Sequence, residues 1–154
     1  MAKTLIIENV KDAIAASSTI VESAKKEIVW ILSPAMAAFF AEYGIPEKSK
    51  MLIEKGGRVR GITKISGTDL DVVRELSDNG EEVRHVDQFQ GAFMVVADKR
   101  ESISSINVNI AHLSLDTEIV GFWTDNQAYV DFLNATFEAA WNEAVDAEEQ
   151  LRKL

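Results

Sequence analysis

Apolar residues along the chain alternate between helical spacing and short continuous runs. From Glu8 to Lys26 the apolar positions recur at roughly helical spacing, which predicts an amphipathic helix. The stretch EIVWILS at 27–33 is an apolar run rich in β-branched and aromatic residues, as is typical of a buried parallel strand. Ser33 and Pro34 then suit the N-cap and the first turn of a helix that ends near Gly44.

The same alternation continues to the end of the chain. We expect strands at 58–65, 81–87 and 117–124 and helices at 46–54 and 67–80. A β-hairpin made of AFMVVADKR and SISSINVN is expected to turn near Asp98 to Glu101. The last helix is predicted from Gln127 to the C-terminus, with Thr124 or Asp125 as its cap. This order predicts an α/β fold with a mixed β-sheet and helices on both faces. In such a fold the binding crevice lies at the carboxyl ends of the strands.

Composition agrees with this fold class and limits the kind of protein to be expected. A chain of 154 residues with 47% hydrophobic and 27% charged residues fits a single soluble domain, 1–154. The absence of cysteine excludes disulfides and cysteine-ligated zinc, and no apolar segment is long enough for a secretory signal or a membrane helix. We therefore expect a cytoplasmic protein without membrane contact. The two histidines lie far apart with no carboxylate at ligand spacing, so neither a metal nor another cofactor is predicted.

The net charge of -9 bears on possible partners. Binding to a nucleic acid relies on clustered Lys and Arg, whereas the basic residues here are scattered. The segment from Asp131 to Gln150 holds six acidic residues and no Lys or Arg. We expect no direct contact between this domain and nucleic acid.

The stretch GAFMVVADKRESISSINVN, together with the order of elements, resembles the phospholipase D-like fold. Active members of that family carry His-x-Lys-x-x-x-x-Asp and then Gly-Ser-x-Asn; the His attacks phosphorus and the Lys holds the phosphate charge. Alignment on FMVV places Gln90, Ala92 and Ala97 at the His, Lys and Asp positions, while Ser105 and Asn107 match the second element. All three reactive groups are absent, so the resemblance implies a phospholipase D-like half-domain that is not an enzyme.

Further motifs run through nearly the whole chain. They are ESAKKEI before a strand that ends in Ser-Pro, GRVRGIT at 57–63, and the turn WTDN at 123–126 before a helix with Phe137 and Trp141. These motifs resemble the noncatalytic sensor domains of TrmB-type archaeal transcriptional regulators and of archaeal sensor histidine kinases. The resemblance implies a ligand-sensing or regulatory domain that passes a signal through its C-terminal helix. Because the chain has no room for a winged helix-turn-helix, we expect either a free-standing sensor or the sensor part of a longer protein, fused to or associated with a DNA-binding or kinase output domain.

Six residues are candidates for a ligand site: Ser33, His85, Gln90, Ser105, Asn107 and Trp123. Gln90, Ser105 and Asn107 would line a polar pocket where phosphate sits in active members, or they are ordinary strand residues bonded to the backbone. His85 would sense pH or contact an anion, unless it is a satisfied polar group of the interior. Trp123 would offer an aromatic face to a flat ligand. We expect a small-molecule ligand of unknown identity.

The last helix also carries apolar residues at alternating steps of three and four: Leu133, Phe137, Ala140, Ala144, Ala147 and Leu151. This stripe predicts either a dimerising coiled coil over about 126–154 or a helix that packs on the sheet and frays at its acidic end. We expect a homodimer. Two other functions stay open, namely a diverged phosphodiesterase that uses His85 or Asp98 and a dimerisation module with no ligand.

Overall fold

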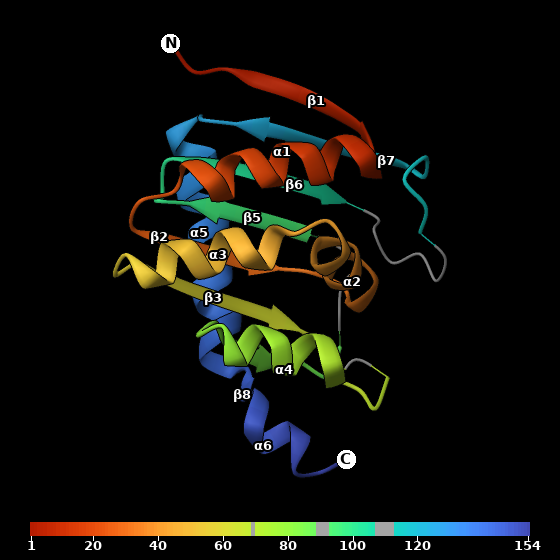
Figure 1. The fold of residues 1–154 in the computed structure, drawn as a ribbon. Coiled ribbons are helices and arrows are strands. Elements are labelled where there is room, and N and C mark those ends of the chain that lie inside the picture. Colours follow the sequence, from red (N-terminus) through yellow and green to blue (C-terminus); the bar gives the residue numbers. More distant parts are fainter. Residues whose placement is uncertain (69, 89–92, 107–112) are drawn as a thin grey trace.

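The computed structural model describes residues 1–68, 70–88, 93–106 and 113–154. Its strands are β1 (Thr4–Asn9), β2 (Glu27–Ile31), β3 (Arg58–Thr63), β4 (Glu82–His85), β5 (Phe93–Ala97), β6 (Glu101–Ile106), β7 (Glu118–Thr124) and β8 (Val145–Asp146). Its helices are α1 (Val10–Ser23), α2 (Pro34–Glu42), α3 (Ile45–Glu54), α4 (Leu70–Asp78), α5 (Gln127–Glu143) and α6 (Ala147–Leu151). The strands form one sheet in the order β1-β7-β6-β5-β2-β3-β4-β8, with α1 to α4 on one face and α5 on the other (Figure 1). The predicted α/β class, with a mixed sheet and helices on both faces, is confirmed.

Strand direction decides which side chains can meet. β2, β3 and β4 are parallel, β5 is antiparallel to β2, and β6 is antiparallel to β5. Thus β2, β3, β4 and β6 all end on one side, which we call the carboxyl end of the sheet; it lies on the right in Figure 1. β7 is antiparallel to β6, so β7 ends on the opposite side.

Two apolar clusters fill the two faces of the sheet. The α1–α4 side is the larger, and there Trp30 of β2 lies across Gly61 of β3. A Cβ atom on Gly61 would lie 1.9 Å from the Trp30 ring, so only glycine fits at this position. On the α5 side, Leu133, Phe137 and Trp141 pack on strand residues that include Val29, Ile62, Met94 and Val96. Leu133 and Phe137 of the predicted coiled-coil stripe are therefore buried against the sheet.

Arg60 of β3 ties α5 to the sheet from the same side. Its Nη2 lies 2.6 Å from Oε1 of Glu138, and its guanidinium carbon lies 5.1 Å and 5.4 Å from the ring centroids of Phe137 and Trp141. Arg84 of β4 donates to the carbonyl of Trp141 at 2.7 Å. Both arginines therefore hold α5 against the sheet.

Side chains fix where helices begin and where the hairpin turns. Ser33 caps α2, because its Oγ accepts from the N–H of Met36 at 3.2 Å, as predicted. The cap of α5 is Asn126, not Thr124 or Asp125, since its Oδ1 accepts from the N–H of Tyr129 at 3.0 Å. The hairpin between β5 and β6 turns after Ala97, as predicted, with positive φ angles of 53° at Asp98 and 55° at Lys99.

The predicted continuous helix from Gln127 to the C-terminus is wrong. α5 ends at Glu143, Val145 and Asp146 pair with His85 and Arg84 as β8, and a separate helix α6 follows. Ladder hydrogen bonds to the open side of β4 are gained only if the helix stops, so tertiary pairing overrides helical spacing. The apolar stripe is thus divided between two helices, and no helix runs over 126–154.

β1 was not predicted, because residues 4–9 include the expected start of the first helix. This strand pairs with β7, more than a hundred residues away in the chain. Asn9 then caps α1, with its Oδ1 accepting from the N–H of Asp12 at 2.8 Å. Among the described residues, none of the helices combines the length and the hydrophobicity needed to cross a membrane.

Candidate functional site

A cleft of about 460 Å³ lies between α5 and the sheet. It is lined by Ile31, Ile62, Val86, Gln88, Phe93, Met94, Ser104, Ser105, Ile106, Val120, Phe122, Tyr129, Phe132, Leu133, Thr136 and Ala140. Most of these side chains are apolar, and they come from five strands, from the segment after β4 and from α5. The volume and the mainly apolar lining are those of sites that bind small organic molecules.

A few hydroxyl groups supply the polar character of the cleft. Ser104 Oγ lies 3.0 Å from the hydroxyl of Tyr129, which joins β6 to α5 across the cleft. The Tyr129 ring packs against Phe122, with ring centroids 5.0 Å apart. Thr136 donates its hydroxyl to the carbonyl of Phe132 at 2.9 Å. No His, Lys, Arg, Asp or Glu occurs among the lining residues that the structure describes.

The four predicted site residues that the structure describes do not all line the cleft. Ser105 lines the cleft, and its Oγ donates to the carbonyl of Ile106 at 3.1 Å. Gln90 and Asn107 lie outside the described residues. Ser33 follows β2 at the carboxyl end of the sheet, where its side chain caps α2. Trp123 lies at the opposite end, because β7 runs antiparallel to β6, and its Nε1–H donates to Glu101 at 3.1 Å.

His85 ends β4 and is buried, with both ring nitrogens in hydrogen bonds. Nδ1 accepts from the N–H of Ile65 at 2.8 Å, so the proton lies on Nε2, which donates to Oδ1 of Asp87 at 2.9 Å. This hydrogen bond lowers the pKa of the exposed Asp87 carboxyl. The arrangement matches a satisfied polar group that holds the segments after β3 and β4 together.

Asp98, the other group considered for catalysis, lies at the opposite end of the sheet from His85. Its carboxylate accepts three backbone N–H groups: those of Lys25 at 2.9 Å, Lys26 at 2.8 Å and Glu27 at 2.9 Å. Burial acts to raise the pKa of Asp98, but these donors outweigh it, and the pKa lies below its ordinary value. The side chain therefore fastens the hairpin to the start of β2.

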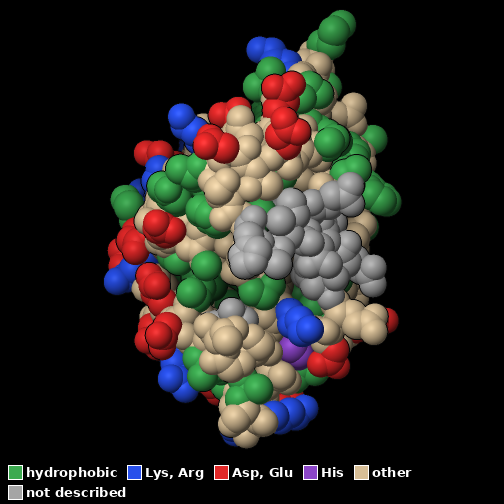
Figure 2. Space-filling view, turned by 90° about the vertical axis from the view of Figure 1, so that its right-hand side faces the viewer, with side chains coloured by type: hydrophobic (Ala, Val, Ile, Leu, Met, Phe, Trp, Pro, Cys, Tyr) green, Lys and Arg blue, Asp and Glu red, His purple; other side chains and the backbone are tan. Residues whose placement is uncertain are grey.

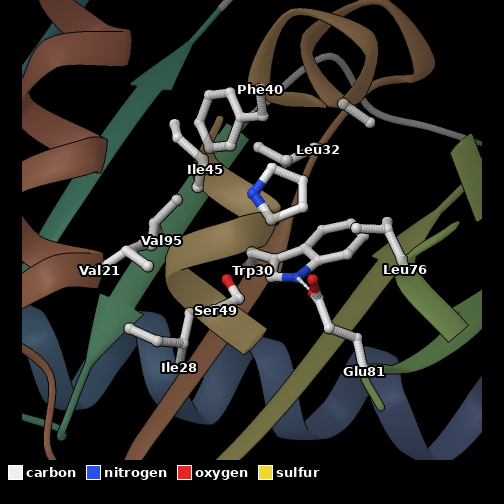
Figure 3. A pocket seen from close by; sticks show the side chains of 12 residues that line it. Val21, Ile28, Trp30, Leu32, Phe40, Ile45, Ser49, Leu76, Glu81 and Val95 are labelled. Atoms are coloured by element: carbon white, nitrogen blue, oxygen red, sulfur yellow. Dashed lines mark hydrogen bonds between the residues drawn. The ribbon is translucent and has the colours of Figure 1, made fainter. Parts of the chain in front are cut away.

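A second, small cavity lies on the other face of the sheet. It encloses about 30 Å³, the space of a single water molecule, among residues of α1, α2, α3, α4 and the adjoining strands. Glu81 lies at its wall, where Oε1 accepts from Trp30 Nε1–H at 2.9 Å (Figure 3). Burial raises the pKa of Glu81 to about 7. The cavity is too small for an organic ligand.

The charged side chains form no metal-binding cluster in the described part of the chain. On the face at the carboxyl end of the sheet, Lys and Arg side chains are scattered among Asp and Glu side chains (Figure 2). Among the described residues, no three His, Cys, Asp or Glu side chains converge as metal ligands would.

Comparison with solved structures identifies proteins with a similar fold. No family model matches the sequence, and no curated protein matches it. Among solved structures, the chain is similar to NucT from Helicobacter pylori, with 13% identity, a TM-score of 0.75, and coverage of 95% of this chain and 99% of NucT. It is also similar to Nuc from Salmonella typhimurium, a phospholipase D family member, with 13% identity, a TM-score of 0.73, and coverage of 95% of this chain and 98% of Nuc.

A third similar structure is TrmBL2, an archaeal chromatin protein. The identity is 14% and the TM-score is 0.71, with 94% of this chain and 54% of TrmBL2 covered, so the chain spans about half the length of that protein. The chain has the phospholipase D-like fold, related to that of TrmB-type proteins. The resemblance found in the sequence motifs is thereby confirmed at the level of fold.

Proposed function

We propose that the chain is a noncatalytic ligand-sensing or regulatory domain of an archaeal transcriptional regulator or signalling protein. The observation that carries the proposal is the cleft of about 460 Å³, whose described lining is mainly apolar and contains no charged side chain. Catalysis of phosphoryl transfer depends on a nucleophile and on groups that stabilise negative charge. A cleft whose described lining offers hydroxyl groups and no base supports binding in preference to turnover.

The two groups available to a diverged phosphodiesterase have other roles. Both nitrogens of His85 are used in hydrogen bonds, and the Asp98 carboxylate holds three backbone amides at the far end of the sheet. Either group would have to abandon these bonds to act on a substrate. The net charge of -9 disfavours direct contact with DNA.

α5 is the element that could transmit a conformational change when a ligand binds in the cleft. Tyr129, Leu133, Thr136 and Ala140 on this helix form one wall of the cleft, and strands form the other. A ligand would therefore contact α5 directly, and the chain continues from α5 into β8, which pairs with β4. A signal requires that the ligand bind one position of α5 more tightly than another, because equal affinity shifts no population.

Native mass spectrometry of freshly purified protein, followed by titration with Nile red as an apolar probe, tests the proposal. We expect Nile red to bind the wild-type protein. Thr136→Phe should lower its affinity roughly tenfold or more, because the new ring occupies the cleft. Thr19→Phe on α1 is a matched control, because Thr19 is also exposed and donates to the carbonyl four residues earlier, Ala15. Equal loss in both variants, or no binding, would contradict a cleft site.

Hydrolysis of bis(p-nitrophenyl) phosphate separates the enzyme alternative. We expect no turnover above background. Turnover that disappears in His85→Ala would overturn the noncatalytic proposal and favour a diverged phosphodiesterase.

A further inference from the structure

The hydroxyl pair of Ser104 and Tyr129 keeps one proton that no described group accepts. Each hydroxyl carries one proton, and only one of the two can lie in the 3.0 Å hydrogen bond between them. Whichever residue donates, the other still has an O–H to give, and among the described residues neither hydroxyl has a further partner. Ser104 is only 7% exposed, and an unmet donor in a buried place costs free energy. The pair is therefore a donor that an acceptor atom in the cleft would satisfy.

Aromatic rings lie beside this donor. Phe122, Tyr129 and Phe132 follow one another, with ring centroids 5.0 Å apart for the first pair and 6.2 Å apart for the second. Phe122 belongs to β7 and the other two residues to α5, and all three line the cleft. Aromatic side chains pack favourably with another aromatic ring, either offset and stacked or edge to face. These rings favour a flat aromatic ligand whose acceptor atom meets the hydroxyl pair.

The sheet beneath α5 adds an aliphatic floor. Ile31 pairs with Ile62 on one side and with Met94 on the other, so these three side chains form a row on the face that carries α5. They line the cleft and offer a ligand dispersion contacts but no hydrogen bond. Most of the ligand that enters the cleft must therefore be apolar, because a polar group over this floor would lose its hydration without compensation.

The charges described around the cleft select against an ionic ligand. No described lining residue is charged, and Arg60, on the same face of the sheet, is already paired with Glu138 at 2.6 Å. A carboxylate or phosphate would lose its hydration there without gaining an opposite charge, and the net charge of -9 disfavours an anion further. An ammonium group has only protons to donate, so it cannot accept from the hydroxyl pair. An uncharged ligand is therefore favoured.

We propose that the ligand is an uncharged aromatic carbonyl compound. Its ring packs against Phe122, Tyr129 and Phe132, and its carbonyl oxygen accepts the spare proton of the pair formed by Ser104 and Tyr129. A carbonyl oxygen suits this place because it accepts a hydrogen bond without bringing a proton that needs an acceptor of its own. The cleft of about 460 Å³ lies within the range of sites that take small organic molecules. This inference rests on the proposed function, that the cleft binds a ligand, and adds the chemical class of that ligand.

Equilibrium dialysis with three naphthalene derivatives tests the inference. 2-Acetylnaphthalene carries a carbonyl, 2-isopropenylnaphthalene has a CH₂ group in place of the carbonyl oxygen, and 2-naphthoate is negatively charged at neutral pH. We expect the ketone to bind the wild-type protein and 2-naphthoate to bind roughly tenfold more weakly or worse, because its charge would be unpaired in the cleft. The hydrocarbon is the internal reference, since it reports burial of the ring without the hydrogen bond.

A double variant, Ser104→Ala with Tyr129→Phe, removes both hydroxyls and keeps the shapes of the side chains. Because both partners of one hydrogen bond are lost together, folding should change little. The dissociation constant of the ketone relative to that of the hydrocarbon should rise roughly threefold to tenfold. Either substitution alone should change this ratio less, since one hydroxyl keeps its proton. Tyr43→Phe is the control: it removes the other tyrosine hydroxyl, at an exposed position at the end of α2, and should leave the ratio unchanged.

The outcomes separate this inference from the proposed function. Suppose that Nile red binds in the cleft, but the ketone does not bind, 2-naphthoate binds as tightly as the ketone, or the double variant leaves the ratio unchanged. Each of these results overturns the inference and leaves the proposed function standing. Absence of Nile red binding overturns both. Infrared spectroscopy adds a direct measurement: the carbonyl stretching frequency of the bound ketone should be lower in the wild type than in the double variant, and equal frequencies would contradict the hydrogen bond.

Discussion

Replacement of Glu81 by Gln should make the protein more stable at alkaline pH and leave it nearly unchanged in mild acid. The carboxyl is buried, and its one described hydrogen bond is accepted from Trp30, a role that an amide oxygen can keep. Burial raises the pKa of Glu81 from 4.5 to about 7 in the folded state. The carboxyl thus stays protonated in the folded protein over a pH range in which the unfolded chain has already lost the proton.

The sign and the size of the effect follow from proton linkage. Below pH 4.5 both states hold the proton, so the stability contribution is complete; between pH 4.5 and about 7 the folded state alone holds it. The free energy of unfolding therefore falls by about 1.4 kcal/mol for each pH unit in this range, about 3 kcal/mol in all, and is constant above it. Gln has no proton to lose, so Glu81→Gln should escape this loss.

Urea denaturation followed by far-UV circular dichroism measures the difference. Because the protein has a pI near 4.7 and is least soluble there, titration should start at about pH 5.5, where about 2 kcal/mol of the effect remains. The difference in free energy of unfolding between Glu81→Gln and the wild type should therefore be about 2 kcal/mol larger at about pH 8.5 than at about pH 5.5. Glu54→Gln, at an exposed position on α3, is the control. Parallel stability curves for wild type and Glu81→Gln would refute the assignment of a protonated carboxyl to this site.

Two further substitutions test the packing around the sheet. Asp98→Ala leaves the three amides of Lys25, Lys26 and Glu27 without their acceptor and puts a Cβ-bearing residue without a polar side chain at a positive φ, so unfolding should become easier by about 1–3 kcal/mol. Asp98→Asn should recover part of this, and an unchanged urea midpoint for the alanine variant would show that the turn holds without the carboxylate. Gly61→Ala should destabilise by about 1–3 kcal/mol or more, because its Cβ overlaps the Trp30 ring, and full wild-type stability in a thermal melt would contradict that packing.

The regular elements could be predicted because their signals are local. The apolar run of β2, the Ser33 cap and the hairpin turn after Ala97 each depend on neighbours in the chain, and the structure confirms them. β1 and the end of α5 could not be found this way. Both depend on pairing with distant strands, β7 for the first and β4 for the second, which periodicity does not report.

The cleft could be predicted only in part from the sequence. Ser105 belongs to it, but most of its lining consists of apolar residues that any core could use. One signal was available in the sequence. Ile106, Val120 and Phe132 are large apolar residues that the structure leaves exposed, at positions where alternation or helical spacing calls for polar ones. Tyr129, whose hydroxyl meets Ser104, carried no signal that set it apart.

The sheet is closed on each side by a segment near one end of the chain, β1 on one side and β8 on the other. Each pairs with the outer backbone groups of its neighbouring strand. β7, with the sequence EIVGFWT, could pair with a strand of another molecule if its outer backbone groups were free. Trimming a handful of residues from the beginning of the chain would therefore do more than shorten it. Such truncation would expose the outer backbone groups of β7 and favour aggregation, so affinity tags and cleavage sites are best placed outside Thr4 and Asp146.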